Sequence, residues 1–299
     1  MAPFGTVLTA DGVRLRYAHW KSTTARARGT MLVAGGRSEF IEKYFETIED
    51  LRARGFQVFC FDWRGQGLSQ RLLKDSEKGY IEDYAQYLRD LDAMLHQVVY
   101  PLGRQPLVLL AHSMGAHIAL RYVQVHEHRI ARLVLSAPML DIYTDPLPRG
   151  IVRRLSRAMV RWGFAQLAVA GSGRHHPFRQ PFVRNRLTSD ASRFARTLKQ
   201  VEENPALSAA QVTYGWLAAT YDAIDALATD GSGRSINLPV LIAVAGKDRV
   251  VRNAEIENLA RGLRCCEMVT IAGARHEILQ EQDPLRSQFW RAFDAFMGI

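Results

Sequence analysis

The segment AHSMG at 111–115 places Ser113 between two small residues, Ala111 and Gly115. Apolar residues precede the serine in a strand-like run, and a helical pattern follows it. Where a strand turns sharply into a helix, the neighbouring backbone lies so close that only small side chains fit at these two positions. A serine at the apex of such a turn is presented to a substrate, so we predict that Ser113 is a nucleophile. The competing interpretation is an inert serine at a helix N-cap.

A base and an orienting carboxylate are needed before a serine hydroxyl can attack. Of the nine histidines, His276 is the one that lies in a loop directly after the last expected strand. Asp248 ends the turn after an earlier expected strand, one strand-helix-strand unit before that histidine. Asp141 also follows a strand and is the alternative carboxylate, whereas His112 adjoins the nucleophile and is expected to point away from it. We therefore predict a triad of Ser113, His276 and Asp248.

Two N–H donors are needed to stabilise the oxyanion of a tetrahedral intermediate. One is expected from the backbone of Met114, the residue after the nucleophile. The other is expected from the loop 35–38, where two glycines let the backbone approach a substrate oxygen. We assign this second donor to the backbone of Arg37, with Gly36 as the alternative donor. A plain Gly-Gly turn is the interpretation without function.

The candidate residues follow apolar runs of the kind found in buried strands. These runs alternate with helical patterns in the parts of the chain before and after the middle segment 143–234. Such alternation predicts an α/β fold, with a mostly parallel central sheet flanked by helices on both faces. Loops at the carboxyl ends of parallel strands meet at one edge of the sheet, so the candidate residues are expected there. The expected strands are 6–9, 13–17, 30–34, 56–61, 107–111, 133–136, 240–245 and 267–271. The expected helices are 41–54, 81–99, 114–126, 254–261 and 284–296.

The middle segment, 143–234, carries several helical patterns and no strong strand pattern. It begins near two prolines and ends at the Gly-Ser-Gly run 231–233. We predict that it is a helical cap, or lid, inserted over the active edge of a core formed by residues 1–142 and 235–299. Aromatic residues of the cap are expected to line an apolar substrate pocket, namely Trp162, Phe164, Tyr214 and Trp216.

Residues 151–162 have helical periodicity with an apolar side and a basic side. The apolar side consists of Ile151, Leu155, Met159 and Trp162. The basic side consists of Arg153, Arg154, Arg157 and Arg161. Two interpretations remain: a lid helix that packs its apolar side over an acyl pocket with its arginines in water, and a basic helix at an anionic membrane surface. Both interpretations favour an apolar acyl substrate.

The chain has 299 residues and a formal net charge of +9, from 39 basic and 30 acidic residues. The excess is concentrated in the stretch 145–186, which holds nine arginines, no lysine and one acidic residue. No nucleic-acid motif and no aromatic stacking platform accompany this stretch, so no nucleic-acid partner is expected. A basic face toward an anionic membrane or a phosphate-bearing substrate fits the pattern better.

Three cysteines without regular spacing argue against a disulfide framework and a zinc site, so no metal or cofactor is expected. No apolar run of about 18 residues is present, which argues against a transmembrane helix. The first residues also lack the pattern of a secretory signal. We expect a reducing, cytoplasmic location, with peripheral contact at the inner face of the membrane as an additional hypothesis.

Seven stretches resemble the lysophospholipase and monoacylglycerol lipase group of α/β hydrolases, which is also called the serine aminopeptidase S33-like group. They are AGGRSEFIEKY, FDWRGQGLSQR, AHSMGAHIALRY, SAPMLDI, TYGWL, AGKDRVV and ARHEIL. The resemblance covers nearly the whole chain, and among members it is strongest to bacterial lysophospholipases of the L2 type. Ala111 stands where the group usually has glycine, and Gly35 stands where many members have histidine.

The resemblance implies an α/β-hydrolase fold and a serine hydrolase that cleaves carboxylic esters through an acyl-enzyme. A lysophospholipid or a monoacylglycerol is the expected substrate. One alternative is a peptidase or amidase acting on small N-terminal residues, although such an enzyme needs acidic groups to hold the substrate ammonium, and this cap is rich in arginine. The other alternative is a non-catalytic binding protein, for which a broken triad would be expected.

Overall fold

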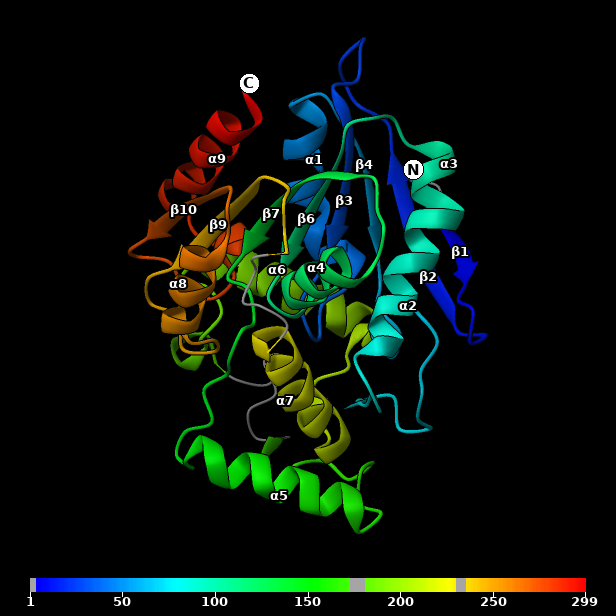
Figure 1. Cartoon of the computed structure of the whole chain (residues 1–299), viewed down its shortest axis with the longest axis vertical. Coiled ribbons are helices and arrows are strands. Elements are labelled where there is room, and N and C mark those ends of the chain that lie inside the picture. The colour runs from blue at the N-terminus through cyan, green and yellow to red at the C-terminus, as the bar shows by residue number, and fades with distance from the viewer. Residues whose placement is uncertain (1–3, 173–180, 230–234) are drawn as a thin grey trace.

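The computed structural model describes residues 4–172, 181–229 and 235–299 (Figure 1). Part of the expected basic stretch, 173–180, and the expected cap boundary at 231–233 lie outside the described residues. The strands are β1 (Phe4–Leu8), β2 (Arg14–Trp20), β3 (Gly29–Ala34), β4 (Phe56–Phe61), β5 (Lys78–Gly79), β6 (Leu107–His112), β7 (Ile130–Ser136), β8 (Gln211–Val212), β9 (Val240–Ala245) and β10 (Cys266–Ile271).

The helices follow the strands in alternation, except in the middle of the chain. They are α1 (Phe45–Ala53), α2 (Ala85–Met94), α3 (Tyr100–Leu102), α4 (Met114–Val125), α5 (Arg149–Arg161), α6 (Ala191–Glu203), α7 (Tyr214–Thr229), α8 (Asn253–Gly262) and α9 (Asp283–Met297). Short 3-10 turns cover Ile41–Tyr44, Phe182–Arg184, Pro205–Leu207 and Ile278–Gln280, and a π-helical turn covers Leu95–Val99.

Within the described residues, eight strands form one sheet in the order β1-β2-β4-β3-β6-β7-β9-β10. The pairs β1–β2 and β2–β4 are antiparallel, and the pairs from β4 to β10 are parallel. Every residue of β3, β4, β6 and β9 is buried, because helices cover both faces of the sheet (Figure 1). The expected mostly parallel α/β sheet is confirmed.

Two local features differ from the sequence-based expectation. The helix expected over 81–99 begins at Ala85, and the N–H of Ala85 donates to the carboxylate of Asp83 at 2.7 Å. In addition, β5 and β8 form a short parallel pair that joins the core to the middle segment. A two-residue strand carries too little periodicity to be predicted from sequence.

The helices α5, α6 and α7 come from the chain between β7 and β9, and α7 lies between α5 and the sheet (Figure 1). Two arginines of the basic side of α5 contact α7, where Arg153 pairs with Asp225 and Arg157 pairs with Asp222. Arg153 and Arg157 are therefore paired and partly shielded, with 30% and 37% of their side-chain surface exposed, whereas Arg154 and Arg161 face water as expected. The amphipathic pattern predicted for α5 is present. The side of the helix that contacts the protein is the one with Arg153 and Arg157, however, and it packs against Asp222 and Asp225 of α7 and not over an apolar pocket.

The opposite, apolar side of α5 is exposed to solvent. Ile151 has 53% and Leu155 has 42% of their surface exposed, and Trp162, just after the helix, has 68%. Arg154 and Arg161 are exposed as well. The outward surface of α5 therefore combines apolar side chains with two arginines.

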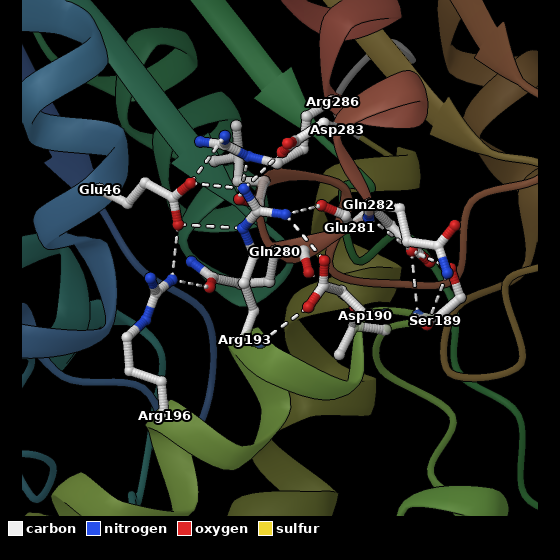
Figure 2. Close-up of polar contacts among 12 residues, drawn as sticks. Glu46, Ser189, Asp190, Arg193, Arg196, Gln280, Glu281, Gln282, Asp283 and Arg286 are labelled. Carbon is white, nitrogen blue, oxygen red and sulfur yellow. Dashed lines mark hydrogen bonds and ion pairs between the residues drawn. The ribbon is translucent and has the colours of Figure 1, made fainter.

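Helix α6 is fastened to the core by a cluster of ion pairs around Arg193 (Figure 2). Its guanidinium contacts the carboxylates of Glu46 on α1, Asp190 at the start of α6 and Asp283 at the start of α9. It also donates to the carbonyl oxygen of Glu281 at 2.9 Å. The Arg193 side chain is nearly buried, so this cluster holds α6 against both α1 and α9.

Replacing Arg193 with methionine is expected to lower the free energy of unfolding by about 3 kcal/mol, because three carboxylates lose a largely buried partner. Urea unfolding of the parent and the variant measures this difference. The control is Lys199→Met on the exposed side of the same helix, which is expected to change stability by less than about 0.5 kcal/mol. Equal effects of the two substitutions would contradict the anchoring role.

Candidate active site

Ser113 lies at the apex of a tight turn between β6 and α4. Its backbone has φ 51° and ψ −115°, a conformation that L-residues rarely adopt. A Cβ atom on Gly115 would lie 2.5 Å from the carbonyl oxygens of both Ala34 and Gly35, so this position requires glycine. Ala111 is fully buried in β6, which accommodates its methyl group. The turn therefore has the shape that the sequence motif predicts.

The structure brings Ser113, His276 and Asp248 together from three loops at the carboxyl ends of β6, β10 and β9. The His276 Nε2 atom lies 2.9 Å from Ser113 Oγ, and the His276 Nδ1 atom lies 2.7 Å from Asp248 Oδ2. All three residues are buried. A carboxylate only accepts hydrogen bonds, so the imidazole proton belongs on Nδ1, which leaves Nε2 to accept from the serine hydroxyl.

The charges around the histidine favour its protonated form. Burial lowers the pKa of His276, but Asp248, and to a smaller extent Glu277 and Glu39, outweigh burial and raise it above its ordinary value. Burial raises the pKa of Asp248, yet His276 and the N–H groups of the following turn hold it below its ordinary value. An imidazolium formed during attack on a substrate is therefore stabilised.

Asp141, the alternative carboxylate, lies elsewhere. Its Oδ2 is 3.0 Å from Arg149 and 3.4 Å from Arg252, and its backbone carbonyl accepts from the Arg252 N–H at 3.1 Å. It therefore joins the start of α5 to the loop that follows Asp248. The geometry separates the two aspartates clearly, because only Asp248 contacts His276 within the described residues.

The two expected oxyanion donors come from two segments next to Ser113, since Met114 follows it in the chain and an added Cβ on Gly36 would lie 3.2 Å from the Ser113 Cβ. Met114 is the first residue of α4, where a backbone N–H has no partner within the helix. In the loop after β3, the N–H of Gly36 donates to the carboxylate of Glu39. Among the described residues, the N–H of Arg37 meets no hydrogen-bond acceptor. Arg37 thus remains the candidate donor, and the alternative, Gly36, is occupied.

Of the four aromatic residues expected to line the substrate pocket, two are buried or partly buried and two are exposed. Trp216 is buried, with the Arg37 guanidinium 5.0 Å from its ring centre, and Tyr214 is partly buried. Trp162 and Phe164 lie on the surface instead, with 68% and 46% of their areas exposed. They do not line an enclosed pocket, because α5 packs against α7 through Arg153 and Arg157 and leaves this part of the middle segment at the surface.

Sequence reasoning missed the buried polar surroundings of the triad. His112 was expected to point away from the nucleophile, but its ring lies beside the triad, with its centre 4.8 Å from the centre of the His276 ring. Behind it, Lys43 pairs with both Glu39 and Glu277. Two signals were available in the sequence: the spacing of four residues between Glu39 and Lys43, and an acidic residue directly after His276.

Within residues 4–172, 181–229 and 235–299, no group of three or more histidine, cysteine, aspartate or glutamate side chains is placed to hold a metal ion. The cysteines Cys60, Cys265 and Cys266 are not joined to each other. None of the helices in the described part of the chain is both long and apolar enough to span a bilayer.

Comparison with known proteins shows the family of the chain. A model of the family described as serine aminopeptidase, S33, matches residues 25–283. The chain belongs to this family. Lysophospholipase L2 of Escherichia coli is 32% identical to this S33-family chain over 271 residues, which cover 86% of the chain and 76% of that protein. Probable lysophospholipase L2 of Haemophilus influenzae is 28% identical over 288 residues, covering 96% and 89%.

Solved structures resemble the chain over its full length. A soluble variant of monoglyceride lipase from Saccharomyces cerevisiae, in complex with a substrate analog, has a TM-score of 0.77 at 17% identity and covers 100% of this chain and 96% of that one. Monoacylglycerol lipase from Paleococcus ferrophilus has a TM-score of 0.72 at 19% identity, covering 95% and 98%. These likenesses show the fold, and the α/β-hydrolase fold expected from the sequence is confirmed.

The turn at Ser113 leads to a first prediction on activity. Gly115→Ala is expected to lower the kcat for a short ester about 100-fold, because the added methyl group displaces the turn and a shift of about 1 Å is sufficient for such a loss. Ala111→Gly is the control and is expected to stay within a few-fold of the parent. A fully active Gly115→Ala enzyme would show that the turn tolerates a side chain there.

The charge of Asp248 leads to a prediction on pH dependence. The kcat/KM of the parent is expected to fall as pH decreases through the raised pKa of His276, because only the neutral imidazole accepts a proton. Asp248→Asn removes the carboxylate that raises this pKa, so the acidic limb is expected to move to lower pH while kcat drops about 10⁴-fold. Asp141→Asn is the control and is expected to leave the limb in place. The reverse ranking of the two variants would contradict the assignment of the acid.

Proposed function

We propose that this S33-family chain is a carboxylic ester hydrolase that works through an acyl-enzyme on Ser113, with a lysophospholipid or a monoacylglycerol as substrate. The observation that carries the proposal is the continuous hydrogen-bonded path from Ser113 through His276 to Asp248. A base within 2.9 Å of the serine hydroxyl is the arrangement needed for nucleophilic catalysis. A non-catalytic binding protein would have no need of it.

The reaction follows from this geometry in two halves. Ser113 Oγ attacks the ester carbonyl while His276 Nε2 takes the hydroxyl proton, and Asp248 stabilises the imidazolium. The N–H groups of Met114 and Arg37 receive the oxyanion. Collapse of the intermediate breaks the bond to the alcohol, which leaves with the proton from His276. A water molecule, deprotonated by the same histidine, then attacks the acyl carbon. The bond to Ser113 Oγ breaks, the serine oxygen takes the proton from His276, and the fatty acid is released.

The substrate class is supported by the relatives and by the charge of the cap. Both bacterial relatives are named as lysophospholipases, and the similar yeast structure is a monoglyceride lipase. A peptidase would need acidic groups to hold a substrate ammonium, whereas α5 alone carries five arginines between Arg149 and Arg161. The ester substrate is therefore favoured over the peptide substrate.

The segment 143–234 is proposed to act as the cap of this enzyme. Three described helices of the segment, α5, α6 and α7, come between β7 and β9, beyond the strand ends that carry Ser113 and Asp248 (Figure 1). The Arg193 cluster and the β5–β8 pair tie the segment to the core. A cap held in this place covers the edge of the sheet where ligands bind in α/β folds.

Peripheral contact with an anionic membrane is proposed for the outward surface of α5. Arg153 and Arg157 are held by α7, so they are not the membrane contacts that the sequence suggested. The apolar pair Ile151 and Leu155, together with the exposed Trp162, fits a lipid surface instead. Arg154 and Arg161 border these side chains and would add attraction to anionic head groups.

The substrate class is tested with a panel of lysophospholipids, monoacylglycerols, short nitrophenyl esters and aminoacyl amides. The esters are expected to be hydrolysed and the amides to react far more slowly. Ser113→Ala is expected to lower kcat about 10⁴-fold or more for every ester, because the acyl-enzyme cannot form. Faster turnover of an aminoacyl amide than of any ester would contradict the proposal and favour the peptidase alternative.

The membrane contact is tested with the double variant Ile151→Ser/Leu155→Ser in sedimentation with vesicles of anionic phospholipid. Binding is expected to weaken about 10-fold, because apolar area is no longer removed from water. Leu102→Ser on α3 is the matched control, since Leu102 and Ile151 are both 53% exposed. Hydrolysis of a short soluble ester is expected to stay unchanged in both variants. If the parent does not bind vesicles at low salt, the contact does not exist.

A further inference from the structure

Lys43 bridges two carboxylates in the interior of the protein, directly behind the candidate active site. Its ammonium lies 2.8 Å from Glu39 Oε1 and 2.6 Å from Glu277 Oε1. The exposed fractions of the three side chains are 3%, 5% and 8%. Burial lowers the pKa of Lys43, but the two carboxylates outweigh burial and raise it, so the ammonium remains charged.

Each carboxylate is attached to a different part of the site. Glu39 accepts hydrogen bonds from the N–H of Gly36 and from the hydroxyl of Tyr44, so it fixes the loop that offers the Arg37 N–H. Glu277 directly follows His276, and its own N–H donates to the carbonyl of Leu187 in the cap at 2.8 Å. The ammonium therefore joins the oxyanion loop to the histidine loop across 234 residues of sequence.

Stability alone does not account well for such a bridge. Replacing a buried ion pair with well-packed apolar side chains is often neutral or stabilising, because desolvation offsets the attraction between the charges. Charged hydrogen bonds also restrict geometry, because they hold the two structural elements that they join at one distance and orientation. In this protein the two elements carry the candidate oxyanion donor and the candidate base, whose mutual placement decides the rate.

We propose that Lys43 is a positioning residue, which acts through Glu39 and Glu277 to hold the oxyanion loop and the His276 loop in register. Glu277 has a second role in this arrangement, because its carboxylate supplies negative charge next to His276. Both roles rest on the proposed ester hydrolysis. Neither side chain takes part in the chemical steps themselves.

The charge role has a definite sign. Ser113 and Asp248 contact His276 by hydrogen bonds, the centre of the His112 ring lies 4.8 Å from that of His276, and Glu277 and Glu39 act on the imidazole through their charges. Burial lowers the pKa of His112 to about 4, so this ring is neutral near neutral pH. Burial raises the pKa of Glu277 and Lys43 opposes that rise; above its pKa, the Glu277 carboxylate favours the imidazolium. Removing this charge moves the acidic limb of kcat/KM to lower pH.

Three variants separate the two roles, with a short soluble nitrophenyl ester as the probe. Lys43→Met breaks the bridge and is expected to lower kcat about 10-fold or more with little change in KM, because alignment is lost while binding is retained. Lys43→Arg restores the charge and is expected to recover part of kcat. Glu277→Gln keeps the shape and the hydrogen-bond acceptor, and is expected to move the acidic limb down by about half a pH unit or more.

The matched control is Arg64→Met, because Arg64 is also a buried cation that bridges two carboxylates, those of Asp11 and Asp90. It is expected to lower the melting temperature while kcat and the acidic limb stay close to those of the parent. Circular dichroism confirms that each variant is folded. If Lys43→Met does not fold, Lys43→Arg decides the positioning role, because its guanidinium changes the length of the bridge and is expected to lower kcat below that of the parent, while Glu277→Gln decides the charge role through its pH profile.

The positioning role is overturned if Lys43→Met matches the parent in kcat, or loses no more kcat than Arg64→Met. The charge role is overturned if Glu277→Gln keeps the acidic limb of the parent. Failure of the proposed function is distinguishable, because Ser113→Ala would then retain ester hydrolysis. An inactive Ser113→Ala beside a fully active Lys43→Met rejects the bridge alone.

Discussion

Both nitrogens of the His276 ring are committed to partners, Asp248 at 2.7 Å on one side and Ser113 at 2.9 Å on the other. An imidazole held at both ends has one orientation and one tautomer, which is the state that a general base needs. The sheet makes this arrangement possible, because β6, β9 and β10 are parallel and end at the same edge, where the loops that follow them carry the three side chains. The strained backbone of Ser113 and the methyl-free Gly115 are consequences of bringing the hydroxyl within reach of the ring.

The surroundings of the ring explain why so many charges are buried in this protein. Asp248 contacts the histidine directly, while Lys43 neutralises the two further carboxylates, Glu39 and Glu277, that lie nearby. Breaking such pairs one partner at a time is costly, because the remaining charge stays buried. The middle segment is joined to the same region, since the backbone carbonyl of Leu187 accepts from the N–H of Glu277 and Arg193 donates to the carbonyl of Glu281. The position of the proposed cap and the position of the His276 loop are thus linked by hydrogen bonds.

The sequence was sufficient for features that depend on local patterns. The strands 56–61 and 240–245 have the predicted bounds, and the candidate triad follows from loops directly after apolar runs. Features that depend on distant partners were not accessible in this way. The orientation of α5 is set by Asp222 and Asp225, more than 60 residues later in the chain. The Lys43–Glu277 contact spans 234 residues, and no local periodicity encodes it.

The central claim is that His276 activates Ser113 for attack, and labelling with a fluorophosphonate tests it most directly. Peptide mapping by mass spectrometry identifies the modified residue, and the rate of labelling reports the nucleophilicity of the hydroxyl. The account predicts one adduct, on the peptide that contains Ser113, and labelling slowed by orders of magnitude in His276→Ala. An adduct on another residue, or a His276→Ala variant that is labelled at the rate of the parent, would contradict it.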